Sequence, residues 1–482
     1  MRTAGGDSSR FLCPQSRYVA RVSGSSAMWH CIRAGLRAPL VTQSSPETSP
    51  PDTTMRFICT SDLHLGRRSS LPSGSSVPGD HSAVAAWDRV VGVALEQAVD
   101  LVIVAGDLVD QANRFFEAHG PLHSGLSRLT SANIPVLAIA GNHDHQTLPS
   151  LAETFSGLTF DLLGREGRWT QRQYQFGHQV LEVVGWSFPD RFVETCPVPD
   201  LPPSLPGTTR RVGIVHGEVG QSSSRSAPLP TARLEAAEVD FWVAGHYHTP
   251  GWQPQTGSAA GILVPGSPQA LDPGAVGVHG PWLVRWPSAA PPEASQCPLS
   301  TIRYEYIDCD ITGLSADQSR EQLVRCVREA LETACAEDSG GVLEHLVCRV
   351  NLVGRSNIQR EIQHTVQAAA SDLEVHVAAR SASVGRVLSQ IVPDRDLEEL
   401  ARAHDPVGHL ARILLELETG EISRETRDLL GSCRTELAGV LSAPAYAGLD
   451  AESPSEIFCR DHLLHEGRRL LETLLDQKVS ST

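Results

Sequence analysis

The 482-residue sequence predicts an α/β protein built on buried strands. Five short apolar runs, each followed at once by polar residues, are typical of buried strands in such a fold. The runs are Ile58–Thr60, Leu101–Val104, Val136–Ile139, Val212–Val215 and Phe241–Val243. Between the first two runs, residues 82–98 carry apolar side chains at helical spacing, as a crossover between parallel strands requires. Because ligands collect at strand carboxyl ends, the polar residues after the runs predict the functional site.

The polar segments behind the five runs carry metal-ligating side chains. The segments are Asp62-Leu63-His64, Gly106-Asp107, Gly141-Asn142-His143-Asp144, His216 and Gly245-His246-Tyr247-His248. Two divalent cations about 3.5–4 Å apart need one carboxylate that touches both, with nitrogen and oxygen ligands around it. Asp107, alone after its strand, is the predicted shared carboxylate. The other predicted metal ligands are Asp62, His64, Asn142, His216, His246 and His248.

Side chains alternate along an extended chain, and this alternation predicts how the ligands pair. Asp62 and His64 would point to one side and hold one ion, and His246 and His248 would also point together. Each segment taken alone would equally fit an ordinary turn or a solvated strand end. The order of the segments, each behind a buried strand, is what predicts a metal centre.

His143 is predicted to be a general acid rather than a ligand. It neighbours Asn142, and adjacent side chains on an extended chain point apart. It would then protonate the leaving oxygen. Asp110 could reach the far nitrogen of His143, fix its tautomer and favour the imidazolium form. A solvated carboxylate at a helix start is an equally good interpretation of Asp110.

At these residues the chain resembles the calcineurin-like metallophosphoesterase superfamily, whose pattern is D-x-H, G-D, G-N-H-[DE], H and G-H-x-H. Ser61–Gly66 and Val264–Gln269 also resemble segments of SbcD-type DNA repair exonucleases, and Gly141–His145 resembles their YhaO-like branch. The resemblance implies a four-layer αββα sandwich with two divalent metal ions, manganese first, with iron or zinc as alternatives. It also implies that the seven predicted ligands bind metal and that His143 is the catalytic histidine.

The chain departs from the protein serine/threonine phosphatases of this superfamily. Those enzymes carry G-D-x-V-D-R-G and G-N-H-E, whereas here Gln111 follows Asp110 and Asp144 replaces the glutamate. These differences count against a protein phosphatase. Some repair nucleases of the group carry a second histidine shortly after the G-D block, where this chain has Asp110.

Length and composition limit the possibilities further. A chain of 482 residues exceeds one ordinary core, so two or three domains are expected. The eleven cysteines are scattered without a C-x-x-C pair, which predicts a cytoplasmic protein without a disulfide framework or zinc ribbon. No apolar run approaches the length of a membrane span, so no membrane association is expected. The net charge of −16 is the main objection to a nucleic-acid substrate, because DNA-binding surfaces are usually basic.

Four regions are expected along the chain. Residues 1–54, rich in Ser, Arg and Pro, are interpreted as a disordered or mis-assigned extension, with Met55 as the real start. Residues 55–290 form the predicted catalytic domain, and the proline-rich stretch 287–298 is interpreted as a linker. Residues 300–385 are predicted to be a small α/β capping domain. Residues 390–482 are predicted to be helical.

Within the predicted capping domain, strands are expected at 301–311, 346–353 and 373–378, with helices at 316–336 and 358–370. In the helical region, apolar residues recur at helical spacing. They are Leu410, Ile413, Leu414 and Leu417, followed later by Leu463, Leu464, Leu470, Leu471 and Leu474. A bundle packed on its own domain is the simpler interpretation. By the resemblance, this region would instead dock an SMC-like, ABC-type ATPase.

The leading functional hypothesis is a two-metal-dependent phosphodiesterase that degrades DNA as a repair exonuclease. One alternative is a phosphodiesterase or phosphatase acting on a nucleotide or sugar phosphate, which the acidic composition favours. The other is a regulatory partner of an SMC-like ATPase. A homodimer is expected from the resemblance alone.

Overall fold

The computed structural model describes residues 54–72, 77, 79–110, 114–257, 259–338, 340–441 and 455–480. The prediction for residues 1–54 therefore falls, except for its last residue, outside the described residues. Among the described residues, no helix combines the length and the apolar character that crossing a membrane requires.

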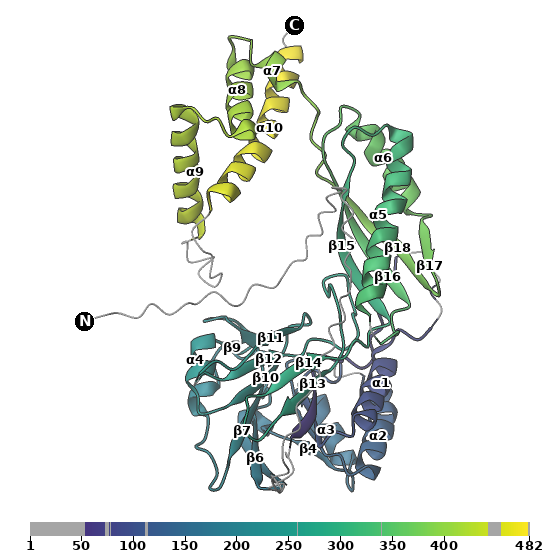
Figure 1. Ribbon diagram of the computed structural model, residues 1–482. Coiled ribbons are helices and arrows are strands. Elements are labelled where there is room, and N and C mark those ends of the chain that lie inside the picture. The colour runs from purple at the N-terminus through teal and green to yellow at the C-terminus, as the bar shows by residue number, and fades with distance from the viewer. Residues whose placement is uncertain are drawn as a thin grey trace, which may run out of the picture.

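Two six-stranded sheets form the N-terminal part of the chain, here called the sandwich domain, residues 55–296 (Figure 1). The first sheet has the order β14 (Glu293–Gln296), β13 (Trp282–Trp286), β1 (Met55–Thr60), β2 (Leu101–Ala105), β3 (Val136–Ile139) and β4 (Phe160–Leu162). The second has the order β11 (Gly251–Gln253), β12 (Gly261–Val264), β10 (Phe241–Gly245), β7 (Arg210–His216), β6 (Gln179–Gly185) and β5 (Thr170–Phe176). The five predicted apolar runs form β1, β2, β3, β7 and β10.

Both faces of the central strands are buried, because the sheets pack on each other and on helices. Along β2, Ile103 lies in the core between the two sheets, whereas Val102 and Val104 lie under the helices. The helices on the first sheet are α1 (Ala83–Glu96), α2 (Phe115–Ser131) and α3 (Thr147–Thr154). The short helix α4 (Thr231–Ala236) packs on the outer face of the second sheet. The predicted four-layer αββα sandwich is confirmed.

The stretch expected to be a linker contributes instead to the first sheet. Within 287–298, β14 pairs antiparallel with β13, so the sheet continues past residue 290. The prolines that suggested a linker flank this strand, and Pro is tolerated beside an edge strand. A small two-stranded sheet, β8 (Glu218–Val219) with β9 (Pro228–Leu229), and the 3-10 helices η2 (Arg165–Gly167) and η3 (Val198–Asp200) complete the sandwich domain.

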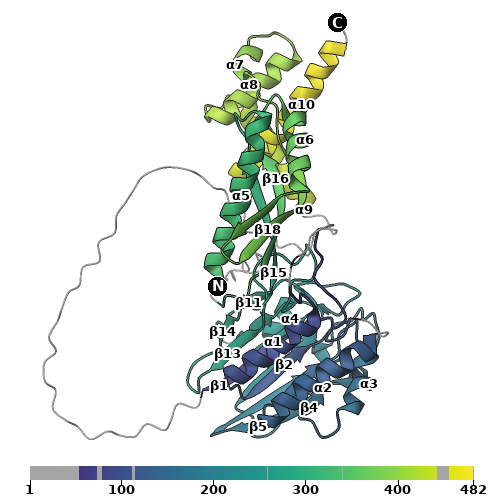
Figure 2. The same cartoon turned by 90° about the vertical axis from the view of Figure 1, so that its right-hand side faces the viewer.

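A four-stranded domain, residues 302–389, follows the sandwich (Figure 2). Its sheet has the order β15 (Ile302–Asp310), β16 (His345–Val353), β18 (Arg380–Ser389) and β17 (Glu374–Val377), and it carries α5 (Ala316–Glu337) and α6 (Gln359–Ala370). The expected elements of the capping domain are present, and β18 is an additional strand between β16 and β17. Tyr304 fixes the domain on the sandwich, because its hydroxyl donates to the Ser70 carbonyl oxygen at 2.6 Å.

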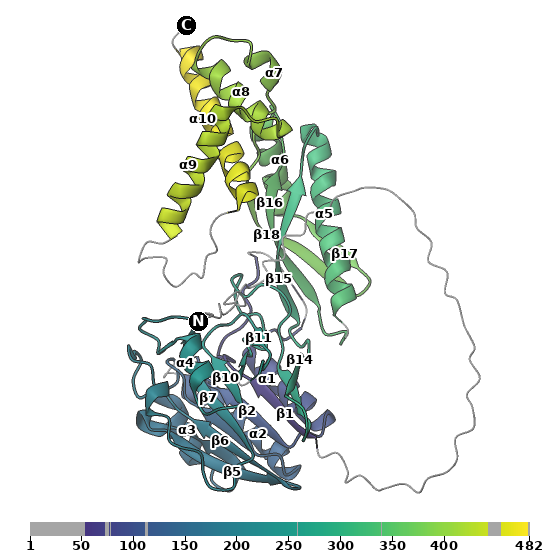
Figure 3. The ribbon, with the colours of Figure 1, turned by 60° about the vertical axis from the view of Figure 1, so that its left-hand side comes forward.

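The C-terminal residues form a helical tail, defined as α7 (Leu397–Leu400), α8 (Pro406–Thr419), α9 (Arg424–Leu441) and α10 (Glu456–Ser480). Figure 3 shows α7 and α8 at the end of the molecule opposite the sandwich domain. α8 and α10 share an apolar core in which Leu414 and Leu471 are buried. Leu470, expected on the same apolar face, is 51% exposed. The predicted apolar repeats therefore pack largely against each other.

Candidate metal centre

The ends of five central strands bring the predicted site residues together. Asp62 follows β1, Asp107 follows β2 and Asn142 follows β3, while His216 ends β7 and His246 follows β10. Contacts across the two sheets join them: the His246 main-chain N–H lies 3.1–3.2 Å from the Asp62 carboxylate oxygens. All nine predicted residues lie around this junction, and their roles remain predictions.

The ligand atoms form two neighbouring groups. Asp62, His64 and His248 make one group, and Asp62, Asp107 and His216 make the other, each with atoms within 4.8 Å of one another. The amide oxygen of Asn142, which belongs beside the second group, lies 3.0 Å from His216 Nε2 and 3.4 Å from His246 Nδ1.

Asp107 faces both groups. Its Oδ2 lies 3.3 Å from His216 Nε2 and 3.8 Å from His64 Nε2. The side chain is also almost fully buried, with the residue 2% exposed. Asp107, a member of the second group, therefore also lies close to a ligand nitrogen of the first, as a shared metal ligand requires, and Asp62 belongs to both groups.

The histidine tautomers test whether cations fit these groups. His64 Nδ1 lies 3.3 Å from an Asp110 carboxylate oxygen, and His248 Nδ1 lies 3.8 Å from Asp272. Carboxylates favour the proton on each Nδ1, which leaves a lone pair on each Nε2. These two Nε2 atoms are only 3.1 Å apart. Two lone pairs that face each other at this distance repel, and a cation between them removes the repulsion.

The second group passes the same test. His216 Nδ1 donates to the carbonyl oxygen of Ala105 at 2.9 Å, so Nε2 is the ring atom that faces the group. Nε2 faces two acceptors, the Asn142 amide oxygen and the Asp107 carboxylate, so the position between them suits a positive charge, either a proton on Nε2 or a metal ion. Nitrogen, carboxylate and amide donors of this kind suit first-row divalent metals. The residues therefore fit a pair of divalent cations.

The pKa values reflect the crowding of charge without metal. Burial opposes protonation of His216, but the Asp107 carboxylate outweighs it and raises the pKa of His216 to about 9. For His246, burial and the neighbouring His216 lower the pKa to about 4. Burial opposes ionisation of Asp107, yet His216 and the other imidazoles hold its pKa well below the usual range. The centre thus attracts positive charge to the position between Asp107 and His216.

Four predicted ligands have a left-handed backbone conformation, whereas the sequence predicted an extended chain at these positions. The φ angles are 51° for Asp62, 50° for His64, 51° for Asp107 and 104° for His246. Residues other than glycine rarely adopt such angles, and each costs on the order of 1–3 kcal/mol. Asp62 and His64 do lie in one group of candidate ligands, but strained turns rather than strand alternation direct them there.

Two glycines of the motifs permit close approach of the strand ends. Gly106 has φ of 88°, and a Cβ there would meet the His216 ring at 2.5 Å from Nδ1. A Cβ on Gly245 would overlap the Ala105 carbonyl oxygen, the acceptor that orients His216. Any side chain at these positions would therefore push the two sheets apart at the centre.

His143 differs from the ligands because its side chain is exposed, beside the buried cluster. Its Nδ1 lies 2.9 Å from the main-chain carbonyl oxygen of Asp110 and must donate to it. The expected contact through the Asp110 carboxylate is therefore replaced by one through the main chain. The carboxylate instead faces His64, and the nearby imidazoles and Arg67 oppose the effect of burial and lower the pKa of Asp110.

Asp144 supports the loops rather than the metal ions. Its carboxylate accepts main-chain N–H bonds from Gly141 at 2.7 Å, Leu108 at 2.7 Å and Val109 at 3.2 Å. Burial and Asp107 raise the pKa of Asp144 to about 7, and the N–H donors oppose this shift. This fully buried side chain thus ties the loop after β2 to the loop after β3.

Asp272 and Arg67 complete the surroundings of the first group. The Arg67 guanidinium lies 3.5 Å from Asp272 and 3.9 Å from Asp110, the carboxylates that face His248 and His64. Asp272 was missed, because no motif or preceding strand marks it in the sequence.

Comparisons with known proteins identify the same region. Residues 55–250 match the family model described as calcineurin-like phosphoesterase. The chain is 27% identical over 247 residues to the uncharacterized metallophosphoesterase YhaO of Bacillus subtilis, which covers 48% of this chain and 57% of that protein. It is 28% identical over 216 residues to the DNA double-strand break repair protein Mre11 of Methanosarcina mazei. This match covers 41% of this chain and 31% of that protein. It is 34% identical over 214 residues to Mre11 of Saccharolobus solfataricus, and this match covers 44% of this chain and 54% of that protein. The matches thus span less than two thirds of each of these relatives.

Proposed function

We propose that this chain is a two-metal-dependent phosphodiesterase acting on DNA as a repair exonuclease. The match of residues 55–250 to the calcineurin-like phosphoesterase family model supports the hydrolysis of phosphoesters. The observation that carries the proposal is the position of Asp107, whose Oδ2 lies within 4 Å of ligand nitrogens in both groups. A mononuclear site has no need of a carboxylate between two ligand sets. Manganese is the proposed metal, with iron or zinc as alternatives.

Bound divalent cations supply Lewis-acid activation of water and neutralise the charge of the phosphate. The side chains proposed to hold them are Asp62, His64, Asp107, Asn142, His216, His246 and His248. The carboxylates of Asp110 and Asp272 keep His64 and His248 in the tautomer that leaves Nε2 available.

His143 is proposed to transfer the proton to the leaving 3′ oxygen. Its ring is exposed and therefore open to substrate, and it packs edge-on against His64 with ring centroids 4.9 Å apart. The bond from Nδ1 to the Asp110 carbonyl oxygen fixes the ring and leaves Nε2 free to hold a proton. Asp110 is thus proposed to act on His143 through its main chain.

DNA is the proposed substrate because relatives named as DNA double-strand break repair proteins match 41% and 44% of this chain. The net charge of −16 favours a second candidate, a phosphodiesterase or phosphatase for nucleotides or sugar phosphates. A third candidate is a regulatory subunit of an SMC-like ATPase. Whether the chain is a DNA exonuclease or a regulatory subunit, we propose that its helical tail contacts the ATPase. We also propose that two copies of the chain associate.

The test is degradation of end-labelled linear DNA with added manganese, comparing the wild type with His143→Ala. His123→Ala, which removes an exposed histidine of α2, is the matched control. We expect the wild type and the control to cleave and His143→Ala to lose at least a hundredfold in rate while keeping its metal, because general acid catalysis contributes about 10²–10⁴-fold. If no protein touches DNA but the wild type hydrolyses a small phosphodiester, the second candidate replaces the first.

A further inference from the structure

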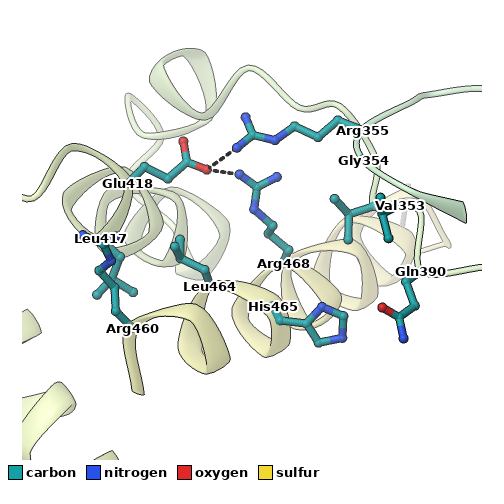
Figure 4. Close-up of a pocket in the computed structure, with 11 residues that line it drawn as sticks. Val353, Gly354, Arg355, Gln390, Leu417, Glu418, Arg460, Leu464, His465 and Arg468 are labelled. Carbon is teal, nitrogen blue, oxygen red and sulfur yellow. Dashed lines mark hydrogen bonds and ion pairs between the residues drawn. The ribbon is translucent and has the colours of Figure 1, made fainter. Parts of the chain in front are cut away.

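A cavity of about 670 Å³ lies at the junction between the four-stranded domain and the helical tail (Figure 4). One wall is the end of β16 together with the segment after β18. The other wall is made by α8 and α10. None of the residues that line it belongs to the metal centre.

The lining is strongly cationic although the chain as a whole is acidic. The charged side chains that line it are Arg355, Arg460, Arg468 and one carboxylate, Glu418, while Asp461, outside the lining, lies 4.0 Å from Arg460. Glu418 Oε1 accepts from Arg355 Nη2 at 3.0 Å and also from Arg468 Nη2, so both guanidiniums share one oxygen (Figure 4). The lining therefore carries three guanidiniums for one carboxylate, in a chain with a net charge of −16.

The wall of the four-stranded domain is held by paired backbone. The Val392 N–H donates to the Gly354 carbonyl oxygen at 3.0 Å, and the Ser356 N–H donates to the Val392 carbonyl oxygen at 2.9 Å. Between them, the Arg355 N–H donates to Thr312 Oγ1 at 3.2 Å. Arg355 thus projects from fixed main chain rather than from a free loop.

The wall of the tail is held by close helix packing. A Cβ at Gly467 would lie 2.8 Å from the Leu414 side chain, so this glycine lets α10 approach α8 closely. The approach brings the neighbouring Arg468 to Glu418. The Arg468 side chain is only 12% exposed, and burial together with Arg355 lowers its pKa, while Asp394 opposes that shift.

This combination defines the chemistry of a ligand. A guanidinium has five N–H donors, and the shared Glu418 oxygen takes one from each arginine. A phosphate group accepts from such donors in pairs and compensates the excess positive charge. Apolar side chains of Val353, Leu417 and Leu464 line the rest of the cavity. Its volume lies within the range of small-molecule sites, about 300–1,000 Å³.

We propose that this cavity binds a nucleotide, with its phosphate on Arg355 and Arg468 and its base against Val353 and Leu464. The nucleotide would bridge the four-stranded domain and the helical tail. It is either a free mononucleotide or the 5′-terminal nucleotide of a strand, since both present the same phosphate and base.

Isothermal titration of the full-length, metal-loaded chain tests the proposal, with adenosine 5′-(α,β-methylene)diphosphate as the probe. Arg355→Gln and Arg468→Gln should each weaken binding at least tenfold. Glu418→Gln should strengthen it severalfold, because it removes the carboxylate that competes with phosphate. A purely structural role for the ion triad predicts no such gain. Arg424→Gln, at an arginine 93% exposed on α9, is the control and should change nothing.

Hydrogen exchange on the same samples locates the ligand, since the metal centre also has affinity for phosphate. Protection of residues 460–468 and 350–356 is expected on probe binding. Equal affinity in all five proteins, or protection confined to the metal centre, would overturn the proposal. Inorganic phosphate that binds as tightly as the nucleotide would overturn the nucleotide assignment. A 5′-phosphorylated oligonucleotide that binds more tightly than the mononucleotide identifies a strand end as the source, and the reverse order identifies the free nucleotide.

Discussion

Replacing Asp110 separates two roles that one residue plays through different atoms. Its carboxylate faces His64 Nδ1 at 3.3 Å, whereas its main-chain carbonyl oxygen accepts from His143 Nδ1 at 2.9 Å. Asp110→Asn and Asp110→Ala remove the carboxylate, which also lies within 4.8 Å of a His143 ring nitrogen, and leave the main-chain contact in place. We therefore expect both variants to bind metal more weakly and, because the hydrogen bond that orients His143 is kept, to change the pH profile of kcat little at saturating metal.

The size of the effect follows from the surroundings of the carboxylate. Asp110 is 8% exposed, so solvent screens its contact with His64 only weakly. Loss of a partner that orients a metal-bound histidine costs about 10–100-fold in metal affinity, or roughly 1.4–2.7 kcal/mol. Asn retains a carbonyl oxygen that can accept from Nδ1, so it should lie near tenfold. Ala retains no acceptor and should lie near a hundredfold.

The assay is manganese titration of metal-stripped protein, followed by hydrolysis of a small phosphodiester across pH at saturating manganese. Asp88→Asn is the matched control, because its carboxylate is 72% exposed on α1 and pairs with Arg128. Unchanged metal affinity in Asp110→Ala, together with an altered pH profile, would refute the structural argument. The carboxylate would then act on His143, as the sequence alone suggested.

Three further results are expected. Gly245→Ala should lower the free energy of unfolding in urea by about 3 kcal/mol and reduce the bound metal, because its Cβ would overlap the Ala105 carbonyl oxygen. Gly251→Ala is the control and should change neither quantity, because a Cβ at Gly251 would point into open space. Glu182→Gln should destabilise by about 3–5 kcal/mol in urea, since Glu182 is fully buried and pairs with Arg211 at 3.0 Å, and a loss below 1 kcal/mol would contradict this. Chelation should abolish phosphodiester hydrolysis and lower Tm, with manganese restoring both; activity that survives complete chelation would rule out the metal mechanism.

The central strands and their order along the chain could be predicted because burial on both faces leaves an unbroken apolar run. β1, β2 and β3 each appear in the sequence as such a run, with a polar residue where the strand leaves the core. Because neighbouring parallel strands end at the same edge of the sheet, the polar residues that follow them lie together. Nine residues spread over almost 190 positions could therefore be assigned to one predicted site. Local sequence thus carried long-range information through the geometry of the sheet.

Edge strands and outer elements are harder to predict from the sequence, because they form through pairing with partners far away in the chain. β14 has polar residues and flanking prolines, and only pairing with β13 makes it a strand. β18 joins its sheet parallel to β16, and its bulge between Cys348 and Arg349 of the partner breaks simple alternation. Asp272 meets His248 because the chain returns to the centre after β12, which no spacing in the sequence encodes.

The predicted ligands come together through turns with a strained backbone rather than through strand alternation. Asp62, His64, Asp107 and His246 are four of the nine described residues other than glycine with positive φ. Glycine would relieve each strain but would remove the ligand, so the chain keeps side chains where the backbone favours none. Packing holds these turns, for example through the three N–H bonds that Asp144 accepts. Sequence reports which side chains are retained, whereas the turns that aim them exist only when the two sheets have met.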